Sequence, residues 1–275
     1  MTMEPGPQLR PAASGKRSRR MIEILALLSE RESLSLAEFS DALGVSPATV
    51  RRDLADLDYQ RLLRRTHGGA TVIDSRAELP VALRDTQFLD AKRAIATQTA
   101  ILIPPERHAV ALSGGSTTAQ VARALSNHRD LTIITNSLTI ATLVTSYPQL
   151  KVIMTGGSLR PQSLELVGIL AENTFNAINV GTAILGTDGI TAAGGVTTHD
   201  ETEARTNHAM VMHAQRTIVV ADGSKIGRIA MAQVAEIGQI HALVTDDTAD
   251  PDALSAIERA GVTVHVVATG DHGAR

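Results

Sequence analysis

Short apolar runs alternate with amphipathic stretches of helical spacing from about Asp90 to the end of the chain. The runs have the length and composition of buried strands. Strands that alternate with helices predict an α/β domain with a mostly parallel sheet. The predicted strands are 108–112, 131–135, 151–155, 182–185, 217–221, 241–245 and 262–267, and the predicted helices are 117–126, 137–145, 203–215 and 251–260.

Glycines and polar residues follow several of the predicted strands, where parallel sheets bind their ligands. The first strand runs into Ser113 and then Gly-Gly-Ser-Thr-Thr, whose N–H groups and hydroxyls suit an anion such as phosphate. One such turn would be an ordinary connection, but their repetition at one edge indicates a pocket for a phosphorylated polyol. The residues predicted from this pattern are Gly114, Gly115, Ser116, Thr117, Thr118, Thr135, Asn136, Ser137, Gly156, Gly157, Asp188 and Lys225.

The composition indicates a globular protein without disulfides. The 275 residues are 43% hydrophobic and 20% charged and include no cysteine, which fits a reducing cytoplasm. We expect a cytoplasmic protein with no signal peptide or membrane span. The formal net charge is −3, so nucleic-acid binding would need a local basic patch. The aromatic content of 2% disfavours modes that stack bases on aromatic rings.

The segment before the α/β domain has the pattern of a helix-turn-helix. Apolar residues from Met21 to Leu28 recur at helical spacing and predict a first helix. Ser35 stands three residues before Glu38, the spacing of a capping box, and opens a second helix that ends at Leu43. A turn through Gly-Val-Ser then leads to a third helix.

The third helix, predicted up to about residue 59, has the surface of a groove-reading helix. Ser46 suits the N-cap and Pro47 the first helical position. Val50, Leu54 and Leu57 form one buried stripe, which leaves small residues and arginines on the other faces. Such a helix can enter the major groove of DNA by its N-terminus.

Two short extended pieces around Gly68 and Gly69 predict a small hairpin, or wing. Three helices and a wing make a winged helix-turn-helix, whereas the alternative is a helical bundle with a solvated basic face. The arginines would contact phosphates, and Ala48 and Thr49 would reach base edges. The predicted DNA-binding residues are Ser35, Ser46, Pro47, Ala48, Thr49, Arg51, Arg52, Arg64, Arg65 and His67.

These patterns predict an α/β chain in four parts. Residues 1–15 are rich in Pro, Gly, Ala and Ser and predict a disordered tail. The winged helix-turn-helix spans 16–72, a polar linker with room for one short helix spans 73–89, and the α/β domain spans 90–270. His199 and His208 are nine residues apart and lack the spacing of a zinc site, so we expect no metal and no cofactor.

The N-terminal motifs resemble those of a known family. The stretch from Ser35 to Leu54, followed by Arg-Arg-Thr-His-Gly-Gly-Ala at 64–70, resembles the DNA-binding domain of DeoR-family bacterial transcriptional regulators. The second domain is similar to that family's sensor domain, and the resemblance covers nearly the whole chain after about residue 16. In the second domain it runs through 114–118, 135–137, 156–157, 186–189, 200–205 and 221–227.

The resemblance implies a sensor fold related to ribose-5-phosphate isomerase and the CoA transferases. It also implies that the protein binds double-stranded operator DNA of a carbohydrate-metabolism operon and that a phosphorylated sugar or sugar-alcohol effector relieves repression. It further implies that the chain forms a homodimer or homotetramer. Asp188, Glu203 and Lys225 match the remnants of an isomerase-type site, and Asp200 joins the predicted effector-binding residues.

Two residues of the predicted pocket depart from the family pattern. The family usually has an aspartate where this chain has Ser113 and a lysine where it has Asn207. Both differences remove charge. Two alternatives therefore stay open: a sugar-phosphate isomerase or acyl-CoA transferase with an appended helical domain, and a domain that only dimerises. An isomerase could use Glu203 as base and Lys225 as cation, although the sequence shows no dense charged cluster.

Overall fold

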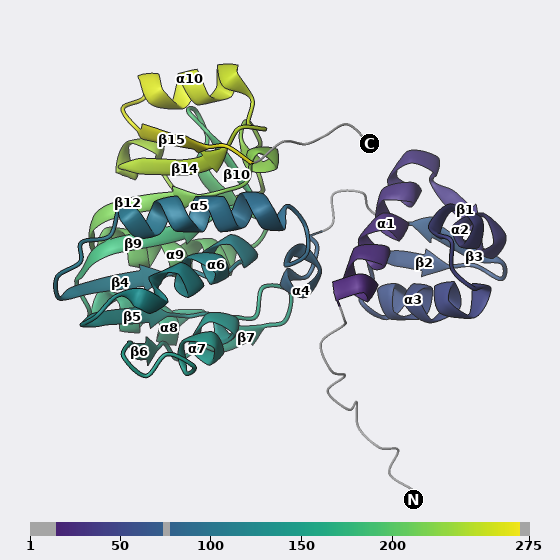
Figure 1. Cartoon of the computed structure of the whole chain (residues 1–275), viewed down its shortest axis with the longest axis horizontal. Helices are drawn as coiled ribbons and strands as arrows, with labels where there is room; N and C mark the ends of the chain where they lie inside the picture. Colours follow the sequence, from purple (N-terminus) through teal and green to yellow (C-terminus); the bar gives the residue numbers. More distant parts are fainter. Residues whose placement is uncertain (1–14, 74–77, 270–275) are drawn as a thin grey trace, which may run out of the picture. The chain divides into compact units, whose positions relative to one another are not determined.

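The computed structural model describes residues 15–73 and 78–269, and the chain divides into two compact units between Gln87 and Phe88 (Figure 1). Of the expected disordered tail, all but Gly15 lies outside the described residues, and so do residues 74–77 of the expected linker.

The first unit contains the three predicted helices and the predicted wing. The third helix begins at Pro47, the second begins directly after Ser35, and each starts where its cap residue predicts. One element was not predicted: β1 pairs with β3, so the wing belongs to a three-stranded antiparallel sheet of order β1-β3-β2. A three-residue strand is too short to show alternation in the sequence. The elements are α1 (Gly15–Arg31), β1 (Ser33–Ser35), α2 (Leu36–Leu43), α3 (Pro47–Tyr59), β2 (Leu63–Arg65), β3 (Gly69–Val72) and α4 (Val81–Arg84).

One hydrophobic core holds the first unit together. The predicted stripe of α3, formed by Val50, Leu54 and Leu57, is fully buried against residues of α1, α2 and the wing. Leu83 of α4 lies in the same core, so part of the segment expected as a linker packs into the first unit.

A seven-stranded sheet forms the centre of the second unit. All seven predicted strands are present, every neighbouring pair is parallel, and the order is β15-β14-β12-β9-β4-β5-β6. This confirms the predicted α/β class. The strands are β4 (His108–Leu112), β5 (Leu131–Thr135), β6 (Lys151–Met154), β9 (Val180–Gly186), β12 (Ala214–Val220), β14 (Ala242–Asp246) and β15 (Thr263–Val267).

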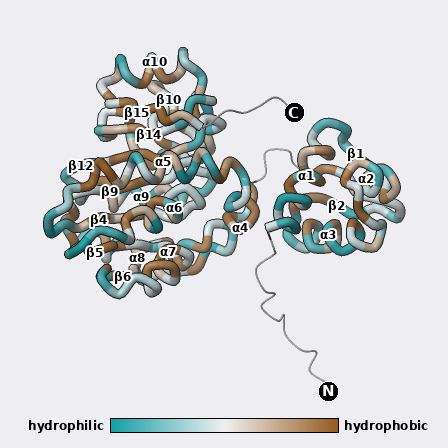
Figure 2. The backbone as a smooth tube through the Cα atoms, viewed as in Figure 1, coloured by the Kyte–Doolittle hydropathy of each residue, from teal (hydrophilic) through white to brown (hydrophobic). Residues whose placement is uncertain are grey.

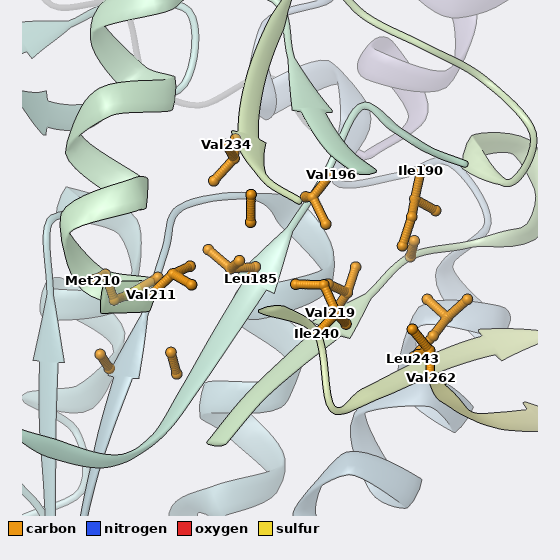
Figure 3. Packing of buried hydrophobic residues seen from close by; sticks show 14 of the residues in the cluster. Leu185, Ile190, Val196, Met210, Val211, Val219, Val234, Ile240, Leu243 and Val262 are labelled. Atoms are coloured by element: carbon orange, nitrogen blue, oxygen red, sulfur yellow. The ribbon is translucent and has the colours of Figure 1, made fainter. Parts of the chain in front are cut away.

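Helices cover both faces of this sheet. Successive strand residues point to opposite sides, so apolar strand residues pack against helices on each face. On β5, Ile133 packs with α5 (Leu89–Ile101), α6 (Ser116–Ala124) and α7 (Leu138–Val144). Its neighbour Ile134 belongs to the opposite core, with α8 (Ile169–Asn176), α9 (Glu201–Met212) and α10 (Pro251–Arg259). Figure 3 shows this second core, and Figure 2 shows hydrophobic stretches along the strands.

Two small β structures were not predicted. The strands β10 (Gly189–Thr191), β11 (Gly195–Thr198) and β13 (Ala232–Ala235) form an antiparallel sheet, and β7 (Ser158–Arg160) pairs with β8 (Glu165–Val167) as a hairpin. Single turns of 3-10 helix, η1 (Leu125–Asn127), η2 (Gly223–Lys225) and η3 (Ile237–Gln239), complete the unit. Within the described part of the chain, no helix has the length and apolar character to cross a membrane.

Candidate DNA-binding surface and effector site

The start of α3 is built as the sequence predicts. The Ser46 hydroxyl accepts a hydrogen bond from Thr49 N at 3.4 Å, and Pro47 occupies the first turn, where no N–H is needed. Pro47, Ala48, Arg51 and Arg52 are exposed, and Thr49 is half-buried. The structure therefore presents the N-terminal surface of α3 to solvent, with two arginines behind it.

The wing adds two exposed arginines and an exposed histidine. Arg64 and Arg65 lie on β2, and His67 lies in the turn before β3; all three are exposed. Ser35 has a structural task, because its hydroxyl and backbone N–H both bind the Glu38 carboxylate, at 2.7 and 2.8 Å. These hydrogen bonds from Ser35 lower the pKa of Glu38. Ser35 thus caps α2 as predicted.

A buried ion-pair group, which the sequence did not indicate, joins α1 to α3. Asp53 is 1% exposed, and its two oxygens accept hydrogen bonds from Arg17 Nε at 3.0 Å and Arg20 Nε at 2.5 Å. Arg17 also pairs with Asp56. Burial alone would lower the pKa of Arg17, but the two carboxylates raise it. Asp53 therefore holds α3 against α1.

In the second unit, the predicted polar residues lie at the carboxyl edge of the large sheet. Ser113 follows β4, and its hydroxyl accepts from Gly186 N at the end of β9 at 3.0 Å. Thr135 at the end of β5 donates to Leu112 O at 2.8 Å, and Ser137 caps α7 by accepting from Ile140 N. Thr118 donates to Gly115 O at 3.0 Å, and Ser116 and Thr117 are largely buried beside it. The loops after β4, β5 and β9 are thus brought together.

Charged residues form a second group, around the start of α9. Arg160 lies 3.2 Å from Asp200 Oδ2 and 3.1 Å from Glu203 Oε2. The Thr198 hydroxyl lies 2.8 Å from Glu203 Oε1 and 3.0 Å from Asp188 Oδ2. Lys225 Nζ is 3.9 Å from Asp188 Oδ1. Three of these residues are carboxylates and two are cations, so the expectation that the domain lacks a dense charged cluster was wrong.

The hairpin β7–β8 connects the two groups. Arg160 belongs to the charged group, and its register partner Glu165 accepts a hydrogen bond from Gly114 N at the first loop. Gly156 and Gly157 form the turn that leads into this hairpin rather than part of either group. At Gly157, where φ is +133°, a Cβ would lie 2.7 Å from Val167 O, so only glycine fits.

Ser113 and Asn207, the two residues that depart from the family pattern, are buried and form hydrogen bonds with uncharged groups. Ser113 joins the ends of β4 and β9 through the hydrogen bond that its hydroxyl accepts from Gly186 N. Asn207 lies one turn after Glu203 on α9, and its Oδ1 accepts from Asn136 Nδ2 at 3.3 Å. The remaining Asn136 Oδ1 is buried without a hydrogen-bond partner in the described structure. An amide pair thus occupies the place where the family pattern has a lysine.

Arg160, Glu165 and Thr198 were missed because no motif contains them. In the structure, Glu165 and Val167 are buried and Leu166 between them is half-buried, so strand alternation places the carboxylate inward with Val167. Within the described ranges, no group of three or more histidines, cysteines or carboxylates is arranged to hold a metal ion. His208 Nδ1 is instead 2.8 Å from Val234 O.

Asp200 supports a prediction about pH. Burial raises its pKa, but hydrogen bonds from Glu203 N, Arg160 and Thr202 N outweigh burial and lower it below 3.8. The stability supplied by this charge is therefore present above pH 3.8 and is lost as the pH falls through the lower folded value. We expect Asp200→Asn to reduce the free energy of unfolding by about 1 kcal/mol at pH 7, since an N-cap charge and its arginine partner are lost.

Urea unfolding of wild type and of Asp200→Asn, at pH 7 and at successively lower pH, checks this expectation. The difference between them should shrink below pH 3.8. A difference that stays constant with pH would contradict it.

Sequence comparisons identify both halves of the chain. A family model described as a DeoR-like helix-turn-helix domain matches residues 20–76, and one described as the DeoR C terminal sensor domain matches residues 87–247. The HTH-type transcriptional regulator GlpR of Haloferax volcanii is 38% identical over 250 residues, which are 90% of this chain and 96% of that protein.

Two further relatives are named as repressors. A putative aga operon transcriptional repressor of Escherichia coli O157:H7 is 34% identical, over 91% of this chain and 94% of its own length. The glycerol-3-phosphate regulon repressor of Escherichia coli K12 is 32% identical, over 84% of this chain and 91% of its own length.

Solved structures superpose only loosely. Ribose 5 phosphate isomerase A from Neisseria gonorrhoeae gives a TM-score of 0.37 at 16% identity, over 51% of this chain and 53% of that one. The sorbitol operon regulator SorC from Klebsiella pneumoniae gives 0.39 at 13% identity, over 87% of this chain and 98% of that one. Superpositions this loose do not bear on function, so the expected relation to the isomerase fold stays a prediction. The two matched domains and the relatives above 30% identity show that the chain belongs to the DeoR family of transcriptional regulators.

Proposed function

We propose that the protein represses a carbohydrate-metabolism operon and that a phosphorylated sugar or sugar alcohol releases it from its operator. The observation that carries the DNA-binding half is the exposed N-terminal surface of α3, with Arg51 and Arg52 behind it and Arg64 and Arg65 on the wing. The formal net charge of the chain is −3, so binding to the phosphate backbone of DNA requires a local basic patch, and these arginines supply one. The operator lies on genomic DNA, so we place the protein in the cytoplasm.

The effector half of the proposal rests on the carboxyl edge of the large sheet. Gly114 to Thr118 lead into α6, where backbone N–H groups and the helix dipole favour phosphate. In the charged group around α9, the Asp200 carboxylate is 30% exposed and can accept from sugar hydroxyls, and Arg160 and Lys225 can attract an anion. Relatives named as a glycerol-3-phosphate regulon repressor and a putative aga operon transcriptional repressor support the sign of regulation.

Release requires that effector binding favours a state that no longer fits the operator. We propose a homodimer or homotetramer, because paired recognition helices bind paired half-sites and a change in their spacing then abolishes binding.

The hydrogen bonds of Glu203 favour this role over the isomerase alternative. Thr198 lies 2.8 Å from one of its oxygens, and Arg160 lies 3.1 Å from the other. A general base must be open to the proton that it abstracts, whereas this carboxylate is 8% exposed and hydrogen-bonded on both sides.

The operator test uses Arg51→Ala/Arg52→Ala in the full chain. Both arginines are exposed, so we expect unchanged stability and a large loss of operator affinity. If each contacts one phosphate, the slope of log affinity against log salt should become shallower by about 2. The control is Arg107→Ala, which removes an exposed arginine from the second unit. Wild-type operator affinity in the double variant would refute this placement of the DNA-binding surface.

The effector test measures binding to the DNA upstream of the protein's own gene, with and without a panel of sugar phosphates and sugar-alcohol phosphates. We expect at least one compound to weaken DNA binding and to raise the melting temperature, since a ligand present at 100 times its Kd stabilises by about 2.7 kcal/mol. A panel without effect on either quantity would favour the alternative in which the second domain only dimerises.

A further inference from the structure

We propose that the Glu165 carboxylate occupies the phosphate position of the effector pocket, so that a phosphate group binds only by expelling it. The inference rests on the proposed function, because it concerns how the same pocket is regulated. Glu165 is then an internal competitor, and the hairpin β7–β8 that carries it is the element that effector binding moves.

The carboxylate lies where an anionic ligand would lie. Gly114 N, in the loop that leads into α6, donates a hydrogen bond to Glu165 Oε1. Glu165 is 1% exposed, so its carboxylate is buried against this loop rather than solvated. A Cβ on Gly114 would lie 2.6 Å from Glu165 Cδ, which shows how closely the side chain packs on the loop. The loop thus already binds an anion, supplied by the chain itself.

Phosphate and the carboxylate cannot share this position. Two negative groups in contact repel each other, and burial strengthens the repulsion because little water screens it. A phosphate that binds to Gly114 N therefore has to take over the hydrogen bond that Glu165 accepts. The affinity of the pocket for phosphate is reduced by the free energy needed to move the carboxylate away.

The hairpin is joined to the segment after β5 by backbone hydrogen bonds. Leu166 N donates to Asn136 O at 2.7 Å, and Leu138 N donates to Leu164 O at 3.0 Å, so displacement of Glu165 has to shift or break these two bonds. Arg160 is the register partner of Glu165 and pairs with Asp200 and Glu203. Displacement of Glu165 would therefore also disturb the charged group around α9.

The experiment titrates the full-length protein with inorganic phosphate in a calorimeter. Glu165→Gln removes the charge but keeps an oxygen for Gly114 N–H, so the variant should fold. We expect it to bind phosphate roughly tenfold more tightly than wild type, as when a like-charge interaction worth one pKa unit is removed. The control is Glu172→Gln, which neutralises a carboxylate on α8 that pairs with Arg205 at 3.1 Å and should leave phosphate affinity unchanged.

Phosphate affinity in Glu165→Gln that equals or falls below that of wild type overturns the proposal, and so does the absence of phosphate binding in every protein. Wild type provides a second measurement if the variant is unstable. Hydrogen exchange of residues 158–167 should become faster at high phosphate concentration, and unchanged exchange contradicts displacement.

The outcome separates this inference from the proposed function. If sugar phosphates release wild type from DNA but Glu165→Gln binds phosphate no better, only the inference fails. If the variant binds phosphate more tightly but no compound of the panel affects DNA binding, only the proposed effector class fails.

Discussion

Gly69→Ala should disrupt the wing and with it the DNA-binding unit. Gly69 begins β3, and a Cβ at this position would lie 1.9 Å from Leu34 O on β1. The obstacle is backbone, so no rotamer change relieves it, and β1 and β3 have to separate. We expect a loss of about 3 kcal/mol or more in the unfolding free energy of this unit, the upper range for overpacking a buried site.

The loss would be a large fraction of the stability of so small a unit, because small domains bury little surface. Thermal unfolding should show an earlier transition for the first unit while the second unit melts as in wild type. Operator affinity should fall in parallel.

Gly68→Ala is a matched control for this substitution. Gly68 is the preceding residue in the same turn, but a Cβ there meets no atom within 4 Å. The two variants add the same methyl group one residue apart, so a difference between them reports the contact with β1 and not the loss of glycine as such. Equal stability of the two variants would show that β1 and β3 are not paired as described.

Asp53→Asn should weaken both the fold of the first unit and its binding to DNA. The carboxylate is 1% exposed and joins Arg17 and Arg20 of α1 to α3. Removal of one partner from a buried group of charges usually lowers the free energy of unfolding by about 3–5 kcal/mol. Both arginines are partly exposed and can be solvated, so we expect a loss of about 2 kcal/mol. Urea unfolding measures this quantity.

The effect of Asp53→Asn on DNA affinity distinguishes positioning from simple charge. Loss of a negative charge next to a DNA-binding surface would by itself strengthen binding. We expect weaker binding, because α3 loses its attachment to α1. Asp41→Asn is the control: it removes an exposed carboxylate from α2, and its stability should change by less than about 0.5 kcal/mol. Operator binding that is tighter in Asp53→Asn than in wild type would contradict the positioning role.

The elements that the sequence predicted well have local causes. Ser46 and Pro47 start α3 because N-cap and first-turn preferences depend on residues within one helical turn. Ile133 and Ile134 reveal a strand buried on both faces, since such strands are continuously apolar. The strand β1 was missed because three residues are too few to show a repeating apolar pattern. The hairpin β7–β8 was missed because its strands are equally short and differ in burial, β7 being mostly exposed and β8 mostly buried.

The residues of the candidate sites likewise divide into those that the sequence predicted and those that only the structure revealed. The exposed arginines of α3 and the glycine-rich loop after β4 could be found from spacing and from the rule that ligands bind at the carboxyl ends of parallel strands. The partners of these residues could not. Asp53 reads as one more polar residue of an amphipathic helix, and only its burial against α1 shows its task.

The sequence by itself determined the winged helix-turn-helix pattern, the seven main strands, four helices of the second unit and the polar edge of the sheet, because each follows from residues a few positions apart; α5 and α8 were not predicted. Tertiary structure alone decided which charges meet. Arg160 reaches Glu203 across 43 positions, and Glu165 reaches Gly114 across 51. Such contacts arise from strand order and from the return of the hairpin to the sheet edge, which depend on the packing of the whole domain and not on any local spacing.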